Sequence, residues 1–151
     1  MTGNPLLDDN ARLVIAHRGN RAHAPENTMV ALRQAVELGA DALEFDVRVT
    51  ADGVPMVLHD ASVERTTGGE GLLSRMNAAE AERLDAGARL PAFHGEGVSI
   101  PRLEEVLDAF RAVPLVIEVK EAAAAAPTER LIRKFGIEGT VVVGSPDASV
   151  S

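Results

Sequence analysis

The pattern of apolar and polar residues near the start of the chain predicts a strand, a helix and a second strand. Residues 13–17 (LVIAH) form a short apolar run of the kind that is buried in a sheet. Residues 26–38 (ENTMVALRQAVEL) carry apolar side chains at helical spacings, and residues 41–50 (DALEFDVRVT) alternate between apolar and polar types. Such a series over about 30 residues is typical of a right-handed unit with two parallel strands.

The ends of the predicted helix carry local signals. Asn27 or Thr28 could cap its start, because both side chains accept hydrogen bonds from the free N–H groups of a first turn. Gly39 follows the last apolar position and is expected to end the helix as its C′ residue.

A hairpin is expected after the second strand. Residues 54–59 (VPMVLH) form another apolar run, which only the letters ADG separate from the strand before it. Parallel strands need a connection of about a dozen residues, whereas Asp-Gly is a strong two-residue turn, so these strands should be antiparallel. Counting back from a two-residue turn places Asp46 opposite His59, on one face of the sheet.

The rest of the chain continues the alternation after a mixed segment. Residues 60–100 hold a Gly-rich stretch, a helical piece near 77–86 and loops, and we interpret them as a subdomain inserted into a single domain of residues 1–151. The remaining predicted elements are a helix at 101–110, a strand at 114–120, a loop at 121–127 that runs into a helix at 128–135 ended by Gly136, and a strand at 140–145.

Alternating helices and parallel strands leave two α/β architectures, the doubly wound sheet and the TIM (β/α)₈ barrel. The first loop lacks the glycine fingerprint of a dinucleotide site. The chemically active side chains lie at the C-terminal ends of strands, where TIM barrels collect their catalytic groups. We therefore expect a TIM barrel. A complete barrel has about 250 residues, so this chain of 151 is expected to hold its N-terminal half to two-thirds, with strand edges that a homo-oligomer could cover.

The composition of the chain limits the classes of partner and chemistry that are expected. Fifteen basic against 23 acidic residues give a net charge of −8, which argues against nucleic acid or an anionic membrane as a partner. The chain has no cysteine, which excludes disulfides, thiolate metal ligands and cysteine nucleophiles. The N-terminal stretch shows no basic leader and no apolar segment of membrane-spanning length, so a cytoplasmic location without membrane insertion is the expectation.

Period-two alternation places His17 on the inward face of the first strand, at the mouth of the barrel, with Arg18 next in the loop. On these two residues alone, a satisfied core histidine and a solvated arginine would be the commoner interpretation.

Three carboxylates are expected at the same mouth. Glu44 and Asp46 share one face of the second strand. Leu43, Phe45 and Val47 on the other face are apolar and must pack on helices, so the carboxylates face the barrel. Glu118 and Lys120 share a face of the strand at 114–120 in the same way. Two other interpretations of Glu44 and Asp46 are charges on an exposed surface and the catalytic pair of a glycosidase. Glycosidase carboxylates, however, normally flank the substrate from different elements.

Like charges in a concave site repel each other unless a cation lies between them. Oxygen ligands without cysteine favour Mg²⁺ or Ca²⁺. Such a cation attracts an anionic substrate, and Arg18 and Lys120 add positive charge for a phosphoryl group. His17 and His59 can then act as acid and base, since an unperturbed imidazole has its pKa near neutral pH.

As an ordered set, the motifs of the chain resemble those of the glycerophosphodiester phosphodiesterase family. LDAG at 84–87 resembles the end of the insertion in that family. The other matching motifs are AHRG at 16–19, PENT at 25–28, GADALEFDV at 39–47, TADGVPMVLHD at 50–60, RTTGGEG at 65–71, IPRLEEVL at 100–107 and IEVK at 117–120.

The resemblance implies a TIM barrel that hydrolyses small glycerophosphodiesters to an alcohol and glycerol 3-phosphate with a divalent metal. Glu26 and Asn27 are expected to fix the loop and the helix start. The other implied roles are general acid and base for His17 and His59, phosphate contacts for Arg18 and Lys120, and metal ligation for Glu44, Asp46 and Glu118.

Two alternatives remain open at this point. The ending GSPDASVS departs from the usual continuation of the family and suggests a fragment, which would leave a catalytically deficient metal-binding or interaction module. A sphingomyelinase D-like phospholipase is the other alternative, which the long segment at 60–100 disfavours.

Overall fold

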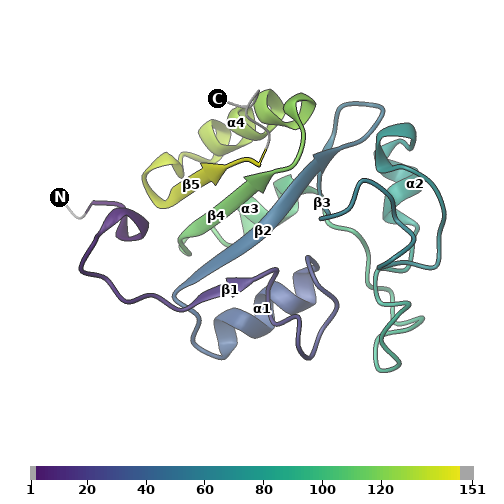
Figure 1. The fold of residues 1–151 in the computed structure, drawn as a ribbon, viewed down its shortest axis with the longest axis horizontal. Coiled ribbons are helices and arrows are strands. Elements are labelled where there is room, and N and C mark those ends of the chain that lie inside the picture. Colours follow the sequence, from purple (N-terminus) through teal and green to yellow (C-terminus); the bar gives the residue numbers. More distant parts are fainter. Residues whose placement is uncertain (1–2, 147–151) are drawn as a thin grey trace.

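The computed structural model describes residues 3–146 as a sheet with helices (Figure 1). Part of the ending GSPDASVS therefore lies outside the described residues. The strands are β1 (Ile15–His17), β2 (Ala42–Val49), β3 (Pro55–Val57), β4 (Leu115–Val119) and β5 (Val141–Gly144). The α-helices are α1 (Met29–Glu37), α2 (Ala78–Glu82), α3 (Leu103–Ala109) and α4 (Ala125–Phe135), and short 3₁₀ turns lie at Pro5–Leu7, Leu73–Arg75, Ala122–Ala124 and Glu138–Thr140.

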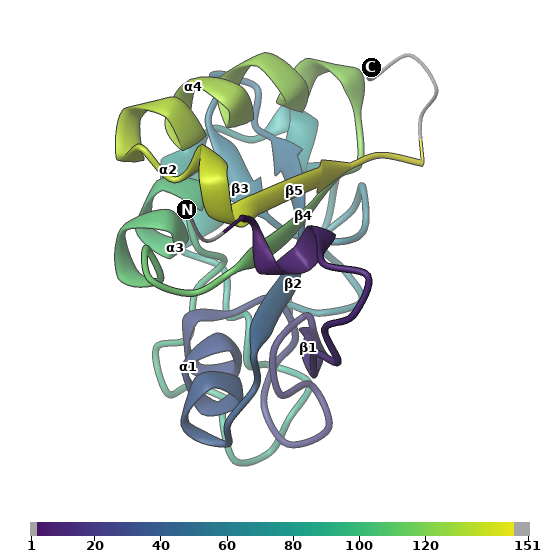
Figure 2. The ribbon, with the colours of Figure 1, turned by 90° about the vertical axis from the view of Figure 1, so that its left-hand side faces the viewer.

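Four strands run parallel in the order β1-β2-β4-β5, and β3 pairs antiparallel with β2. Helices α1, α3 and α4 lie on the same side of these strands (Figure 2), and their apolar side chains form one cluster with β2 and β4. The arrangement is part of a (β/α) barrel wall, as predicted.

Alternation along β2 divides its side chains between two faces. Leu43, Phe45 and Val47 have no exposed surface and pack in the cluster beneath the helices, which confirms the predicted buried face. On the opposite face the apolar Ile15 of β1 is 45% exposed. The polar residues of β2 lie on that opposite face, because successive side chains of a strand point to opposite sides.

The register predicted for the hairpin is wrong by one residue. Val47 pairs with Val57, and the N–H of Leu58 donates to the carbonyl of Asp46 at 3.0 Å, so Leu58 rather than His59 lies opposite Asp46. The loop is longer than a two-residue turn because Thr50 closes it: its hydroxyl accepts from the N–H of Val54 at 3.0 Å.

β1 and β3 lie along the same edge of β2 and run toward each other. β1 follows β2 as far as His17, which is opposite Glu44, while β4 occupies the other edge. β3 pairs with β2 from Val49 back to Val47. The segments that leave β1 and β3 therefore meet beside Glu44 and Asp46.

Helix ends agree in part with the prediction. The hydroxyl of Thr28 accepts from the N–H of Ala31 at 3.3 Å and caps α1, and Gly39 follows the helix with a φ of +93°. The segment at 121–127 runs into a helix as predicted, but α4 begins at Ala125, three residues before the predicted start at 128. Alanine has the highest helix propensity, and Pro127 is tolerated in a first turn.

Residues 60–100 contain only one short α-helix, α2, beside turns and loops. Their buried apolar residues, which include Val63 and Leu73, form a second cluster with Met56 of β3. Within residues 3–146, no helix has the length and apolar character needed to cross a bilayer.

Candidate active site

The three predicted carboxylates lie together at the C-terminal ends of β2 and β4. One oxygen from each of Glu44, Asp46 and Glu118 falls within 4.8 Å of the other two. The parallel register explains this proximity, since Asp46 is directly opposite Glu118 and Glu44 precedes Asp46 by two residues on the same face.

Burial and mutual repulsion act on this group. The pKa of Glu44 is raised to about 7, first by burial and then by the negative charge of Asp46. The pKa of Glu118 is lowered instead, because Lys120 donates a hydrogen bond to it, with Nζ 2.8 Å from Oε1.

Asp46 is the most enclosed member of the group, with no exposed surface. Its Oδ2 accepts from Asn27 Nδ2 at 2.9 Å and lies 3.2 Å from Arg18 Nε, while its Oδ1 lies 3.5 Å from Lys120 Nζ. The two cations predicted for the rim thus both contact a carboxylate, and their side chains are only 13% and 12% exposed.

The residues fit a divalent cation. Glu44 Oε1 and Asp46 Oδ1 are buried and accept no hydrogen bond from any residue between 3 and 146, although a buried acceptor normally has a partner. A hard cation prefers carboxylate oxygens and would satisfy both atoms at once. Glu44, Asp46 and Glu118 are therefore the residues that would hold it.

His17 lies at one side of this group. Its Nε2 is 3.4 Å from Glu44 Oε2, and about half of the side chain is exposed. Burial and the positive charges of Arg18 and Arg21 lower the pKa of His17, which favours the neutral form of the ring.

His59 is held by its neighbour in sequence. Its Nδ1 lies 2.7 Å from Asp60 Oδ1. The pKa of Asp60 is lowered to about 2, mainly by a hydrogen bond from Arg65, so the carboxylate is ionised and can only accept. Nδ1 therefore carries the hydrogen, and Nε2 remains as the ring atom that can exchange a proton with a substrate.

The loop between β1 and α1 has an unusual backbone. Arg18 and Asn27 adopt φ values of +60° and +57°, although neither is glycine, and such conformations are uncommon outside turns and functional sites. At Gly19, with φ +79°, an added Cβ would lie 2.6 Å from the carbonyl carbon of Ala31. The close approach fixes the loop on α1 and aims Arg18 and Asn27 at Asp46.

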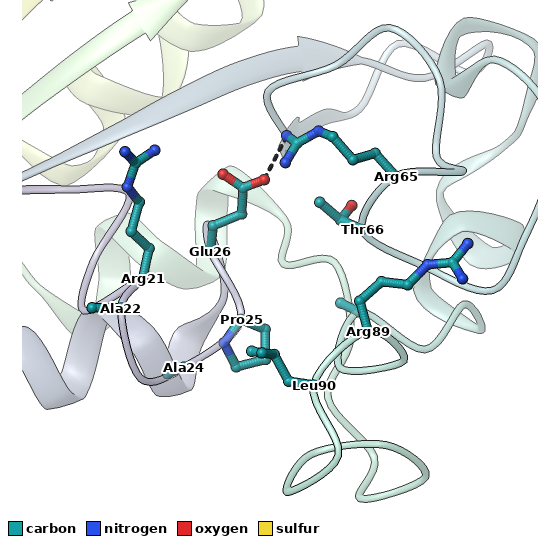
Figure 3. A pocket seen from close by; sticks show the side chains of 10 residues that line it. Arg21, Ala22, Ala24, Pro25, Glu26, Arg65, Thr66, Arg89 and Leu90 are labelled. Carbon is teal, nitrogen blue, oxygen red and sulfur yellow. Dashed lines mark ion pairs between the residues drawn. The ribbon is translucent and has the colours of Figure 1, made fainter.

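Two cavities adjoin these residues. One has a volume of about 480 Å³ and is lined by His17, Glu44 and Glu118, together with Val116 of β4 and the residues after β5. The other has a volume of about 380 Å³ and lies between the β1–α1 loop and the segment at 60–100, with Glu26 and Arg65 at its edge (Figure 3). The first is the space in which a substrate would meet the carboxylates.

Sequence reasoning did not assign three contacts of the site: Asn27 to Asp46, Asp60 to His59, and Glu26 to Arg18, in which Nη1 lies 2.6 Å from Oε2. Asp60 directly follows His59, and that adjacency was the available signal. Nothing in the sequence shows the positive φ that turns Asn27 toward β2.

The glycerophosphoryl diester phosphodiesterase family model matches residues 17–144 of the chain. The chain belongs to this family. A glycerophosphodiester phosphodiesterase of Caldanaerobacter subterraneus is 40% identical over 141 residues, which are 88% of this chain and 57% of the relative. The chain thus spans little more than half the length of this relative.

Solved structures agree with the fold. The crystal structure of glycerophosphodiester phosphodiesterase from Agrobacterium tumefaciens is 35% identical, with a TM-score of 0.88, over 93% of this chain and 60% of that one. A phosphodiesterase of Oleispira antarctica, solved in complex with the product sn-glycerol-3-phosphate, is 30% identical, with a TM-score of 0.83, over 92% and 59%. The part of the barrel present here has the family's arrangement of strands and helices.

Proposed function

We propose that the protein hydrolyses glycerophosphodiesters to an alcohol and glycerol 3-phosphate, with Mg²⁺ or Ca²⁺ as cofactor. The observation that supports this most is the meeting of Glu44, Asp46 and Glu118 in one group, with His17 against Glu44. His59 directly follows Leu58, whose N–H donates to the carbonyl of Asp46 at 3.0 Å. The Oleispira antarctica relative, solved with sn-glycerol-3-phosphate, supports the choice of product.

In this proposal the carboxylates of Glu44, Asp46 and Glu118 hold the cation, which when bound supplies positive charge beside the phosphoryl oxygens. Arg18 and Lys120 contact the phosphate from the same side. Both side chains already form ion pairs with Asp46.

The two histidines move protons. One ring takes the proton of the attacking hydroxyl, which forms the new bond to phosphorus, and the other gives a proton to the oxygen of the departing alcohol. The attacking hydroxyl comes from water or from the glycerol of the substrate itself, by way of a cyclic phosphate that water then opens. Nε2 of His59 is the proton-exchanging atom, because Asp60 holds the hydrogen of Nδ1.

A metal-binding or interaction module without catalysis is the second candidate. The observation that favours it is that all three carboxylates lie on β2 and β4, two of the four parallel strands described, so a metal site is built without any other part of a barrel.

Turnover separates the two candidates. The protein is incubated with glycerophosphocholine or glycerophosphoethanolamine in the presence of Mg²⁺, Ca²⁺ or EDTA, and the released glycerol 3-phosphate is measured by a coupled assay. The oligomeric mass of the protein is measured under the same conditions. Metal-dependent release that Glu44→Gln abolishes supports the enzyme. Metal binding without release of glycerol 3-phosphate supports the module. If sphingomyelin is the only substrate that is cleaved, and choline rather than phosphocholine is released from it, the result would point to the sphingomyelinase D-like activity instead.

A further inference from the structure

Arg65 belongs to the motif RTTGGEG, to which the proposed chemistry gives no role. Its guanidinium contacts both oxygens of Asp60: Nε lies 2.8 Å from Oδ2, and Nη2 lies 3.1 Å from Oδ1. A planar fork on both oxygens of a carboxylate fixes its rotation as well as its position. Since Oδ1 is also the acceptor for His59 Nδ1, the fork determines where the imidazole can lie.

The same guanidinium reaches the loop after β1. Arg65 Nη2 lies 2.5 Å from Glu26 Oε1 (Figure 3). The other oxygen of Glu26 accepts from Arg18, which in turn contacts Asp46. A continuous series of ion pairs therefore joins His59 to a carboxylate of the proposed metal site, although the two lie on segments that approach from opposite directions.

The middle of this series is shielded from water. The side chains of Glu26 and Arg18 are 12% and 13% exposed, so their charges are screened less than those of surface pairs. Burial alone would raise the pKa of Glu26, but the ion pairs with Arg18 and Arg65 outweigh it and lower the pKa. Arg65 is the more exposed member of the series, with half of its side chain accessible, and it lines the 380 Å³ cavity.

We infer that Arg65 is a positioning residue that orients His59 through Asp60 and ties it, through Glu26 and Arg18, to the carboxylates around Asp46. The inference rests on the proposed function, because it concerns the orientation of His59 for proton transfer. Lysine could supply the charge but not the planar fork that contacts Asp60 and Glu26 together.

The test compares Arg65→Met and Arg65→Lys with Arg89→Met. Arg89 lines the same cavity and is exposed, but among residues 3–146 its guanidinium donates only to the carbonyl of Glu64, at 2.8 Å. With glycerophosphocholine and saturating metal, we expect Arg65→Met to lower kcat about 10- to 100-fold, with KM within about threefold. Arg65→Lys should lie between Arg65→Met and wild type, and Arg89→Met should match wild type.

A second readout does not need turnover. Nitrogen-15 NMR of the histidine rings at pH 8 reports which nitrogen carries the hydrogen. His59 should be in the Nδ1–H form in wild type and Arg89→Met, and should become a mixture of both forms in Arg65→Met. If Arg65→Met does not fold, as judged by near-UV circular dichroism, Arg65→Lys takes its place in both measurements.

Each outcome decides the inference. A lowered kcat with an altered His59 tautomer supports it. A raised KM at unchanged kcat would mean that Arg65 contacts the substrate. Unchanged kinetics with an unchanged tautomer would mean that Arg65 only forms surface ion pairs. Either result overturns the inference. If wild type turns over no glycerophosphodiester, the proposed function fails, and the tautomer comparison still decides the role of Arg65.

Discussion

The ring of His17 lies against the carboxylate of Glu44, with 3.4 Å between Nε2 and Oε2. One side chain is a proposed acid or base and the other a proposed metal ligand, and they are brought together by directly paired positions of β1 and β2. A proton-transferring ring beside a cation-holding carboxylate places both parts of the proposed chemistry within reach of one phosphate.

Loss of either imidazole should therefore affect turnover rather than metal binding. We expect His17→Ala and His59→Ala each to lower kcat by about 100-fold or more, while the affinity for the metal, measured by calorimetry, changes little. The matched control is His94→Ala, since His94 is exposed on the segment at 60–100 and should behave as wild type. Near wild-type turnover in either of the first two variants would contradict the assignment.

The raised pKa of Glu44 predicts a pH dependence of stabilisation by metal. Without metal, the folded protein holds the proton of Glu44 up to pH about 7, whereas an unfolded chain releases it near pH 4.5. The contribution of Glu44 to stability is therefore most favourable at low pH and falls as the pH rises from about 4.5 through 7. A bound cation offsets the cost of the ionised group.

Thermal unfolding checks this sign. The rise in Tm on adding saturating Mg²⁺ or Ca²⁺ should be larger at pH 8 than at pH 5.5 in wild type. In Glu44→Gln the rise should be smaller and should depend less on pH. An equal rise at both pH values in wild type would show that Glu44 does not ionise on binding.

The close approach at Gly19 predicts a specific loss of stability. Alanine there must adopt a φ of +79° and place its Cβ 2.6 Å from backbone of α1, which should cost about 2–4 kcal/mol of the free energy of unfolding. Gly39 is the control, because its φ is also positive but its Cβ would meet nothing within 4 Å, so Gly39→Ala should cost about 1–2 kcal/mol. Equal losses in urea unfolding would argue against the clash.

The buried face of β2 gives a test of the packing. Phe45 has no exposed surface, and Phe45→Ala should lower the free energy of unfolding by about 3–5 kcal/mol. Leu38, at the end of α1, is 74% exposed, so Leu38→Ala should change it by less than about 0.5 kcal/mol. A small effect at Phe45 would mean that the sheet does not bury this face.

Local patterns in the sequence were sufficient to predict the strands and the meeting of the three carboxylates. Alternation alone placed Glu44 and Asp46 on one face and predicted that Glu118 would join them, because parallel strands bring their C-terminal ends to one edge. The structure brings these three together as that reasoning expected.

Contacts that depend on loop conformation could not be predicted. The hairpin register depended on Thr50 closing the loop through its hydroxyl, and a turn motif of two letters does not show this. Asn27 reaches Asp46 through a positive φ, and Arg65 reaches Glu26 across 39 positions of sequence. Such contacts are set by how loops pack on the barrel wall, for which period and propensity carry no signal.

Calorimetric titration of Mg²⁺ and Ca²⁺ at pH 8 into wild type and Glu118→Gln tests the central claim most directly. Glu104→Gln is the control, since Glu104 is half exposed and pairs with Lys134 away from the group. We predict one ion per chain in wild type and in Glu104→Gln, with an affinity at least about tenfold weaker in Glu118→Gln. Equal affinity in all three proteins, or no binding to wild type, would contradict a metal site built from Glu44, Asp46 and Glu118.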